Sequence, residues 1–187
     1  MRQMVFVDGS NLLRQLATEC GVNIRADKPP DAALRKAAAI ASKMASEGVP
    51  KRSWLIRSYW FGSYQGNEED ERHYASVLRE CGFEPVLFRQ REGREKGVDI
   101  ALTKEMLVNA FNQNYDLAVV IAGDEDYVGL VSEAKRHGPI INGAFVNSGL
   151  SEALRLACDS FRVARYSPEH FLKQQMDEFK LLLEAKT

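Results

Sequence analysis

Hydrophobic and polar positions along the chain form two alternating kinds of segment. Short runs rich in β-branched and aromatic residues, typical of strands, are separated by longer stretches with apolar residues at helical spacing. The expected strands are residues 5–7, 53–61, 84–88, 117–121 and 140–146, with a sixth at 161–164. The expected helices are residues 10–17, 31–47, 68–80, 98–112, 126–137 and 150–156. Strand and helix therefore alternate through most of the chain.

Residues that favour helix termini mark several of these boundaries. Asn67 is the expected N-cap of the helix at 68–80, and Asp31 that of the helix at 31–47. The run at 117–121 is wholly apolar, as in a strand buried on both faces. Because parallel strands need crossover helices, we expect an α/β three-layer sandwich with a mostly parallel sheet of five or six strands.

The end of the chain has a different pattern. Apolar residues recur there every three to five positions, at Phe171, Leu172, Met176, Phe179, Leu182 and Leu183. We expect a domain at residues 1–166 followed by an amphipathic helix at 167–187. The apolar face of this helix either packs on the helical layer of the sheet or forms a homodimer or partner contact.

Composition narrows the class of protein. The chain has 187 residues, 45% of them hydrophobic, and its 25 Lys and Arg against 26 Asp and Glu give a net charge of −1. A polyanion would therefore have to bind to a local patch. The spacing of Cys20, Cys81 and Cys158 fits neither a disulfide framework nor a zinc site, so we expect buried free thiols. No signal peptide or membrane-spanning run is apparent, and we expect a soluble cytoplasmic protein.

Four carboxylates follow strands or begin helices where a ligand site is expected. Ligands of open α/β sheets bind at the carboxyl ends of the strands, at a topological switch point. Asp8 follows the first strand, Asp124 and Asp126 follow the fourth, and Asp99 begins a helix. Two carboxylates about 6 Å apart repel by roughly 3 kcal/mol at an effective dielectric of 20. A cluster of four favours a bound hard cation, Mg²⁺ or Mn²⁺, although each acid could instead cap a helix.

Three segments in order resemble a known family. Asp8-Gly-Ser-Asn11, Lys96-Gly-Val-Asp99-Ile-Ala-Leu and Ala-Gly-Asp124-Glu-Asp126-Tyr are similar to the signature segments of the NYN domain family, in its LabA-like branch, over about residues 3–147. The resemblance implies a PIN-like ribonuclease fold with sheet order 3-2-1-4-5 and a metal pocket. It also implies metal-coordinating and catalytic roles for the four acids and a pocket role for Asn11. The chain departs from the family pattern at Ala122, where Ser is common, and at Tyr127, where Phe is common.

Candidate substrate contacts lie next to these acids. They are Ser10, Asn11, Arg89, Arg91, Arg94 and Lys96. The basic residues fall in one Gly-containing stretch before Asp99 and could contact phosphates. Trp60, Phe61 and Tyr64 could stack on a base, although core packing is the simpler expectation.

The favoured function is therefore a metal-dependent ribonuclease that hydrolyses RNA, with single-stranded RNA as the expected substrate, to products with a 5′-phosphate and a 3′-hydroxyl. The alternative is a PIN-like RNA- or protein-binding regulatory module with little or no catalysis, suggested by Ala122 and the C-terminal helix. A haloacid-dehalogenase type of phosphatase is disfavoured, because Ser10 stands where that chemistry needs a second acid.

Overall fold

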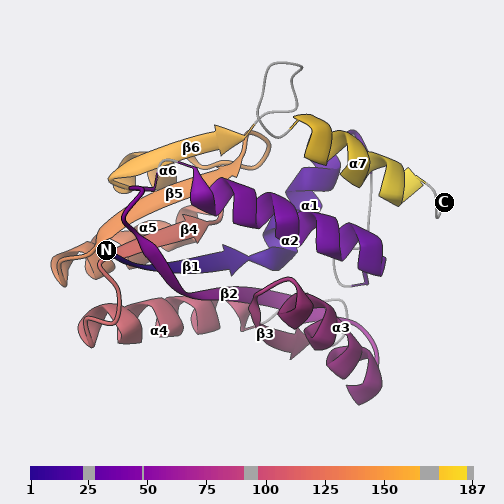
Figure 1. Ribbon diagram of the computed structural model, residues 1–187, viewed down its shortest axis with the longest axis horizontal. Coiled ribbons are helices and arrows are strands. Elements are labelled where there is room, and N and C mark those ends of the chain that lie inside the picture. Colours follow the sequence, from indigo (N-terminus) through magenta and orange to yellow (C-terminus); the bar gives the residue numbers. More distant parts are fainter. Residues whose placement is uncertain (23–27, 48, 91–96, 165–172, 185–187) are drawn as a thin grey trace.

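A six-stranded parallel sheet runs through the computed structural model, with helices on both of its faces (Figure 1). The structure describes residues 1–22, 28–47, 49–90, 97–164 and 173–184. The strands are β1 (Arg2–Asp8), β2 (Trp54–Tyr64), β3 (Glu84–Arg89), β4 (Leu117–Ile121), β5 (Ile140–Val146) and β6 (Ser160–Ala164). They lie in the order β3-β2-β1-β4-β5-β6, and every pairing is parallel. The expected α/β fold and strand order are thus confirmed, and the expected sixth strand joins the sheet.

Alternation of side chains along β1 separates two cores. Val5 and Val7 belong to a core shared with α1 (Gly9–Glu19), α2 (Asp31–Ser46), α3 (Glu68–Glu80) and α7 (Lys173–Glu184). Met4 and Phe6 belong to a second core, shared with α4 (Val98–Phe111), α5 (Val128–Arg136) and α6 (Glu152–Ala157). Successive side chains of a strand point to opposite faces of the sheet, so β1 is buried on both faces.

Two helix starts test the capping expectations. Asn67 caps α3 as expected, with its side chain accepting the backbone N–H groups of Glu69 and Asp70 in a capping box. Asp31 is instead the first residue of α2, and Pro30 occupies the N-cap position without a side-chain hydrogen bond. Proline holds the backbone in the extended conformation that an N-cap residue adopts, which explains the difference.

The C-terminal helix packs on the rest of the chain. Met176, Phe179 and Leu183 of α7 are buried in the core that includes α2, and Lys36 of α2 pairs with Glu178. This confirms the expectation that the apolar stripe covers the helical layer. Phe171 and Leu172, also assigned to the stripe, lie outside the described residues. Within the described ranges, no helix combines the length and the apolar character needed to cross a membrane.

The order of the strands creates a switch point beside β1. From β1 the chain first extends the sheet through β2 and β3, and then returns to place β4 on the other side of β1. Val7 pairs with Ile121 at the carboxyl ends of β1 and β4. The residues that follow these two strands therefore emerge side by side, in the position where ligands of such sheets bind.

Candidate functional site

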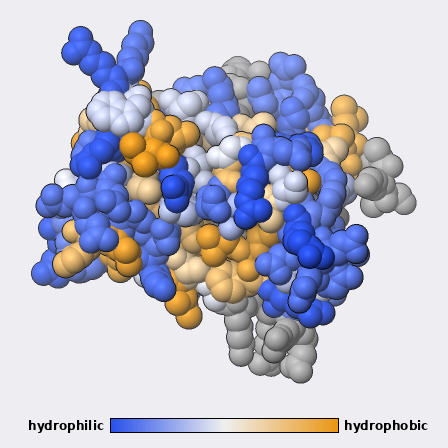
Figure 2. Space-filling model, turned by 60° about the horizontal axis from the view of Figure 1, so that its bottom comes forward, coloured by the Kyte–Doolittle hydropathy of each residue, from blue (hydrophilic) through white to orange (hydrophobic). Residues whose placement is uncertain are grey.

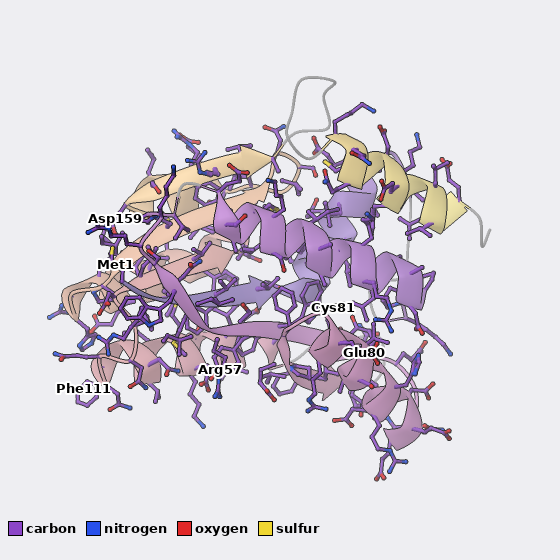
Figure 3. The ribbon with its side chains drawn as sticks, in the orientation of Figure 1. Met1, Arg57, Glu80, Cys81, Phe111 and Asp159 are labelled. Atoms are coloured by element: carbon purple, nitrogen blue, oxygen red, sulfur yellow. The ribbon has the colours of Figure 1, made fainter. Side chains whose placement is uncertain are left out.

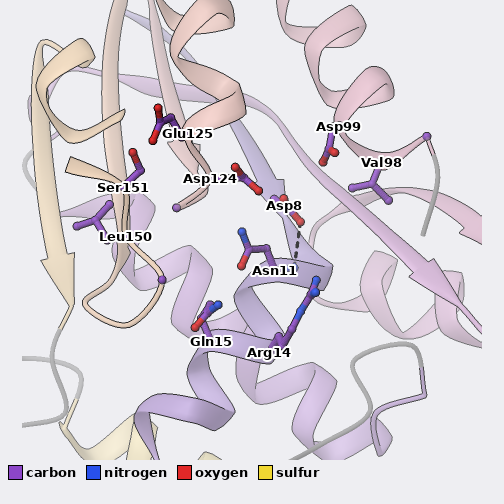
Figure 4. A pocket seen from close by; sticks show the side chains of 13 residues that line it. Asp8, Asn11, Arg14, Gln15, Val98, Asp99, Asp124, Glu125, Leu150 and Ser151 are labelled. Atoms are coloured by element: carbon purple, nitrogen blue, oxygen red, sulfur yellow. Dashed lines mark hydrogen bonds between the residues drawn. The ribbon is translucent and has the colours of Figure 1, made fainter. Parts of the chain in front are cut away.

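A pocket of about 520 Å³ lies at this switch point (Figure 4). It is lined by segments that are far apart in the sequence, within residues 8–15, 97–99, 123–125 and 149–151. Three of the four predicted acids, Asp8, Asp99 and Asp124, are among the lining residues. Folding therefore brings together carboxylates from three separate stretches of the chain.

Asp8 is the last residue of β1 and is buried. One carboxylate oxygen, Oδ1, accepts the backbone N–H of Asn11 at 3.0 Å and so caps α1. The other oxygen, Oδ2, accepts the hydroxyl of Tyr127 at 3.0 Å. Asp8 therefore caps α1, as the helix-capping alternative predicted, but its second oxygen contacts Tyr127 instead of α1.

Asp99 lies in the first turn of α4, two residues after Gly97, whose backbone conformation sets the path of the chain into the helix. Gly97 is the N-cap of α4 with φ of 99°, and a Cβ there would come within 3.0 Å of the Phe88 ring. A glycine adopts this backbone conformation without strain. The Oδ1 atom of Asp99 accepts the Tyr127 hydroxyl at 2.8 Å.

Asp124 follows β4 and caps a short 3-10 helix at Glu125–Tyr127, where its Oδ1 accepts the backbone N–H of Asp126 at 3.1 Å. The preceding residue is glycine because there is no room for a side chain. A Cβ at Gly123 would lie 2.5 Å from the carbonyl oxygen of Gly149. The carbonyl of Gly123 also accepts the N–H of Ser151 at 2.8 Å. These contacts hold the loop that carries Asp124 against the loop that follows β5.

Asp126 is exposed and is not among the residues that line the pocket. The helix expected at 126–137 begins as this 3-10 turn and continues as α5 from Val128. The tight turn carries Tyr127, rather than Asp126, toward Asp8 and Asp99.

Tyr127 joins two of the acids. Its side chain is 1% exposed, and its single hydroxyl contacts both Asp8 and Asp99. Burial, together with the charges of these carboxylates, holds the pKa of the phenol far above its usual range. A neutral phenol has one proton, so it donates fully to only one carboxylate. The remaining negative charge favours a bound cation.

The chemistry of these donors fits a hard divalent ion. Carboxylate oxygens without His or Cys suit Mg²⁺ or Mn²⁺. Among the described residues, however, no group of three acidic, His or Cys side chains lies close enough together to hold an ion. A cation would therefore have to draw the side chains of Asp8, Asp99 and Asp124 closer to one another.

The predicted substrate contacts divide into four groups. Asn11 lines the pocket. Ser10 is buried and accepts the N–H of Ser63 at 2.8 Å, which ties α1 to β2. Arg89 is exposed at the end of β3 and does not line the pocket. The other three, Arg91, Arg94 and Lys96, lie outside the described residues.

The aromatic and cysteine candidates belong to the core. Trp60, Phe61 and Tyr64 are buried, so their rings are not exposed for base stacking. All three cysteines are free, as expected. Burial raises the pKa of the Cys20 thiol to about 11 and that of Cys158 to about 12, so neither is a reactive thiolate at neutral pH.

Several lining residues were missed in the sequence. Arg14 and Gln15 follow Asn11 by three and four positions, so all three share one face of α1. Residues 149–151 follow β5 and could have been found by the same strand-end rule that identified the acids. Among the described lining residues, Arg14 is the one with a cationic side chain.

Comparison with known proteins identifies the family. The family model of the NYN domain matches residues 2–166. No match to the chain was found among curated proteins. Among solved structures, a protein of unknown function from Vibrio parahaemolyticus is similar, with a TM-score of 0.61 and 18% identity over 87% of this chain and 91% of that chain. That likeness concerns the fold alone, and the family match does not separate the LabA-like branch. NYN domains are part of the PIN-like nuclease superfamily, and this chain belongs to the NYN domain family.

Proposed function

We propose that this protein is a metal-dependent ribonuclease. The observation that carries the proposal is the shared pocket of Asp8, Asp99 and Asp124 at the switch point of an NYN-domain sheet. These three carboxylates would hold Mg²⁺ or Mn²⁺. When bound, such an ion polarises a phosphodiester and lowers the pKa of a coordinated water.

The remaining lining residues suit a phosphate-containing substrate. Arg14 supplies positive charge and paired N–H donors, which match phosphate oxygens. Asn11 supplies an amide that can hydrogen-bond a phosphate or a ribose hydroxyl. Figure 4 shows both side chains on α1, next to Asp8. They would hold the substrate beside the carboxylates, and the second oxygen of Asp8 is already oriented by its contact with Tyr127.

The substrate class is RNA, and single-stranded RNA fits best. A pocket of about 520 Å³ has the size of a small-ligand site, so it would admit a nucleotide of a single strand rather than a duplex. Attack by water on the phosphorus would leave a 5′-phosphate on one product and a 3′-hydroxyl on the other.

The test is cleavage of end-labelled single-stranded RNA with Mn²⁺ or with EDTA, in the wild type and in Asp8→Asn and Asp124→Asn. Asparagine caps helices about as well as aspartate, so both variants should keep the fold while losing a charged ligand. We expect cleavage that needs Mn²⁺ and falls by about 100-fold or more in each variant. Cleavage that persists with EDTA, or that is equal in all three proteins, would refute the proposal.

A second candidate is an RNA-binding module with little catalysis. It is supported by the hydroxyl of Tyr127, which already contacts the two carboxylates that a cation would share, and by the separation of the described acids. In this case, fluorescence anisotropy would detect binding of labelled RNA without turnover, and Asp8→Asn would leave the affinity unchanged.

A further inference from the structure

The amino-terminal part of β2 has an unpaired edge. β2 pairs with β1 from Trp54 onward, whereas β3 pairs only with the later part, beginning with Tyr59 opposite Glu84. On the side away from β1, residues 54–58 therefore have no neighbouring strand within the described structure. The free edge of a strand presents N–H and C=O groups that can pair with another chain.

The direction of the backbone shows which groups face outward. The N–H of Trp54 donates to the carbonyl of Met1 at 3.0 Å, so the backbone of Trp54 faces β1. Successive residues of a parallel strand direct their backbone groups to opposite sides. The N–H and C=O of Leu55 consequently face the open side. The register of β2 against β1 shifts just after this residue, because Leu55 pairs with Gln3 whereas Arg57 pairs with Met4. Beyond this bulge the carbonyl of Tyr64 accepts the N–H of Gln90 on the β3 side, so alternation counted back from Tyr64 places the backbone groups of Ser58 on the open side as well.

The side chains along this edge are apolar and exposed. Trp54 and Leu55 are each 57% exposed and Ile56 is 46% exposed, although all three belong to a strand of the central sheet. The face turned forward in Figure 2 carries apolar patches bordered by hydrophilic side chains. Exposed apolar residues next to one another at a sheet edge are typical of an interaction surface.

A hollow of about 320 Å³ adjoins this edge. It lies between residues 55–58 of β2 and the end of α3 with the turn into β3, lined there by Arg79 and residues 82–84. Because β3 begins at Glu84, the hollow occupies the position that an upstream extension of β3 would fill. The hollow therefore has the position in which an added strand could pair with residues 54–58 of β2.

Charge indicates what would fill it. Arg57 and Arg79 line the hollow, Lys51 and Arg52 precede the strand, and Glu84 is the single acid among the described lining residues. Figure 3 labels Arg57 beside β2 and Met1 at the start of the neighbouring β1. Two copies of this chain paired edge to edge would bring these cations toward one another, which is unfavourable. The charges instead suit an acidic segment.

We propose that the free edge of β2 binds an extended acidic peptide segment of a partner protein by strand addition. The backbone of the peptide would pair with Leu55 and Ser58, which both line the hollow, and its carboxylates would contact Arg57 and Arg79. This surface lies at the amino end of β2, away from the pocket at the carboxyl ends of the strands. The partner would therefore dock without entering the ribonuclease pocket.

The test uses a fluorescein-labelled peptide of alternating Val and Glu residues, with a Val and Lys peptide as its counterpart. Fluorescence anisotropy with the full chain should show the acidic peptide binding at least about tenfold more tightly than the basic one. Hydrogen exchange should show the Leu55 amide becoming protected when the acidic peptide is added.

Charge reversal provides a matched pair of variants. Arg79 and Arg136 are both exposed arginines in the last turn of a helix, and each lies near a glutamate, Glu84 and Glu133 respectively. Arg79→Glu should weaken binding of the acidic peptide by about tenfold, and Arg136→Glu by less than about twofold. Equal binding of the two peptides, an unprotected Leu55 amide, or equal effects of the two variants would overturn the proposal. The proposal would also be overturned if the acidic peptide did not bind and Arg79→Glu instead abolished binding of labelled RNA or self-association of the chain.

Discussion

The phenol oxygen of Tyr127 lies 2.8 Å from Oδ1 of Asp99, and the same atom lies 3.0 Å from Oδ2 of Asp8. One buried hydroxyl thus links the end of β1 to the start of α4. Because it has a single proton, it cannot fully satisfy both carboxylates. This contact reduces the repulsion between the acids without removing it, and a cation bound by both acids would compete with it for their lone pairs.

Tyr127→Phe should therefore change how stability depends on metal. Without the hydroxyl, the buried carboxylate of Asp8 loses a donor, and we expect the metal-free protein to lose about 1–2 kcal/mol of unfolding free energy at neutral pH. Mn²⁺ should then stabilise the variant more than the wild type, since ligand binding to the native state adds stability. Urea unfolding with EDTA and with Mn²⁺ measures both effects.

Tyr64→Phe is the matched control. The hydroxyl of Tyr64 donates to Oε2 of Glu71 at 2.6 Å, outside the pocket. This variant should also lose stability, but its response to Mn²⁺ should equal that of the wild type. If Tyr127→Phe and Tyr64→Phe respond to Mn²⁺ alike, the hydroxyl that contacts Asp8 and Asp99 has no influence on metal binding.

Asp124 and Asp126 should contribute unequally to activity. Asp124 lines the pocket, whereas Asp126 does not and provides its backbone N–H to Oδ1 of Asp124. Asp126→Asn keeps that N–H, so we expect kcat/KM for RNA cleavage to fall by less than about threefold, against about 100-fold or more for Asp124→Asn. Steady-state kinetics at saturating Mn²⁺ compares the two. Equal losses would mean that Asp126 turns into the pocket when metal binds.

The fold was predictable because its signals are local. The strand at 117–121 is apolar throughout, and Asn67 with Asp70 three positions later forms the capping box that starts α3. The positions of Asp8 and Asp124 at the carboxyl edge of the sheet also follow from the rule that ligands bind at the carboxyl ends of the strands. This rule needs only the strand boundaries and a parallel sheet.

The contacts within the site were not predictable in the same way. A tyrosine after Asp126 fits a buried helix face, and periodicity does not indicate where its hydroxyl points. The contact between Tyr127 and Asp8 joins residues 119 positions apart and depends on how the 3-10 helix at Glu125–Tyr127 packs against α4 and β1. Asp126 lies outside the pocket because the chain forms a 3-10 turn there. The pattern of apolar residues does not predict such a turn.

The pair of Arg2 and Asp116 should make stability depend on pH. The backbone N–H and the guanidinium of Arg2 both donate to the carboxylate of Asp116, at 2.7 and 2.6 Å, and they hold its pKa below the usual value. A lowered carboxyl pKa adds stability above the unfolded-state value of about 3.9, and this contribution is lost as the pH falls through the folded-state value.

Asp116→Asn removes the titrating group. We expect the variant to be less stable than the wild type at pH 7, by under about 1 kcal/mol because the pair is partly exposed, and the difference should shrink toward pH 3. Urea unfolding at both pH values checks this. A difference that stays constant or grows at acidic pH would show that the ion pair does not contribute in the expected direction.

The C-terminal helix should stabilise the domain rather than form a dimer. Phe179 is fully buried between α7 and the rest of its core, so Phe179→Ala should cost about 3 kcal/mol of unfolding free energy. Leu181, on the same helix, is 64% exposed, and Leu181→Ala should change stability little. Urea unfolding of the two variants distinguishes a buried face from an exposed one.

Light scattering after size exclusion tests the dimer alternative on the same helix. If α7 serves only to cover α2, the wild type and Leu181→Asp should both have the mass of one chain, and deleting residues 173–187 should lower stability because it exposes the apolar partners of Met176 and Phe179. A wild-type mass of two chains that falls to one in Leu181→Asp would instead make the exposed side of α7 an interface.

The division into a domain at 1–166 and a helix at 167–187 stays a prediction. The deletion tests it, since a fully separate helix could be removed without loss of stability.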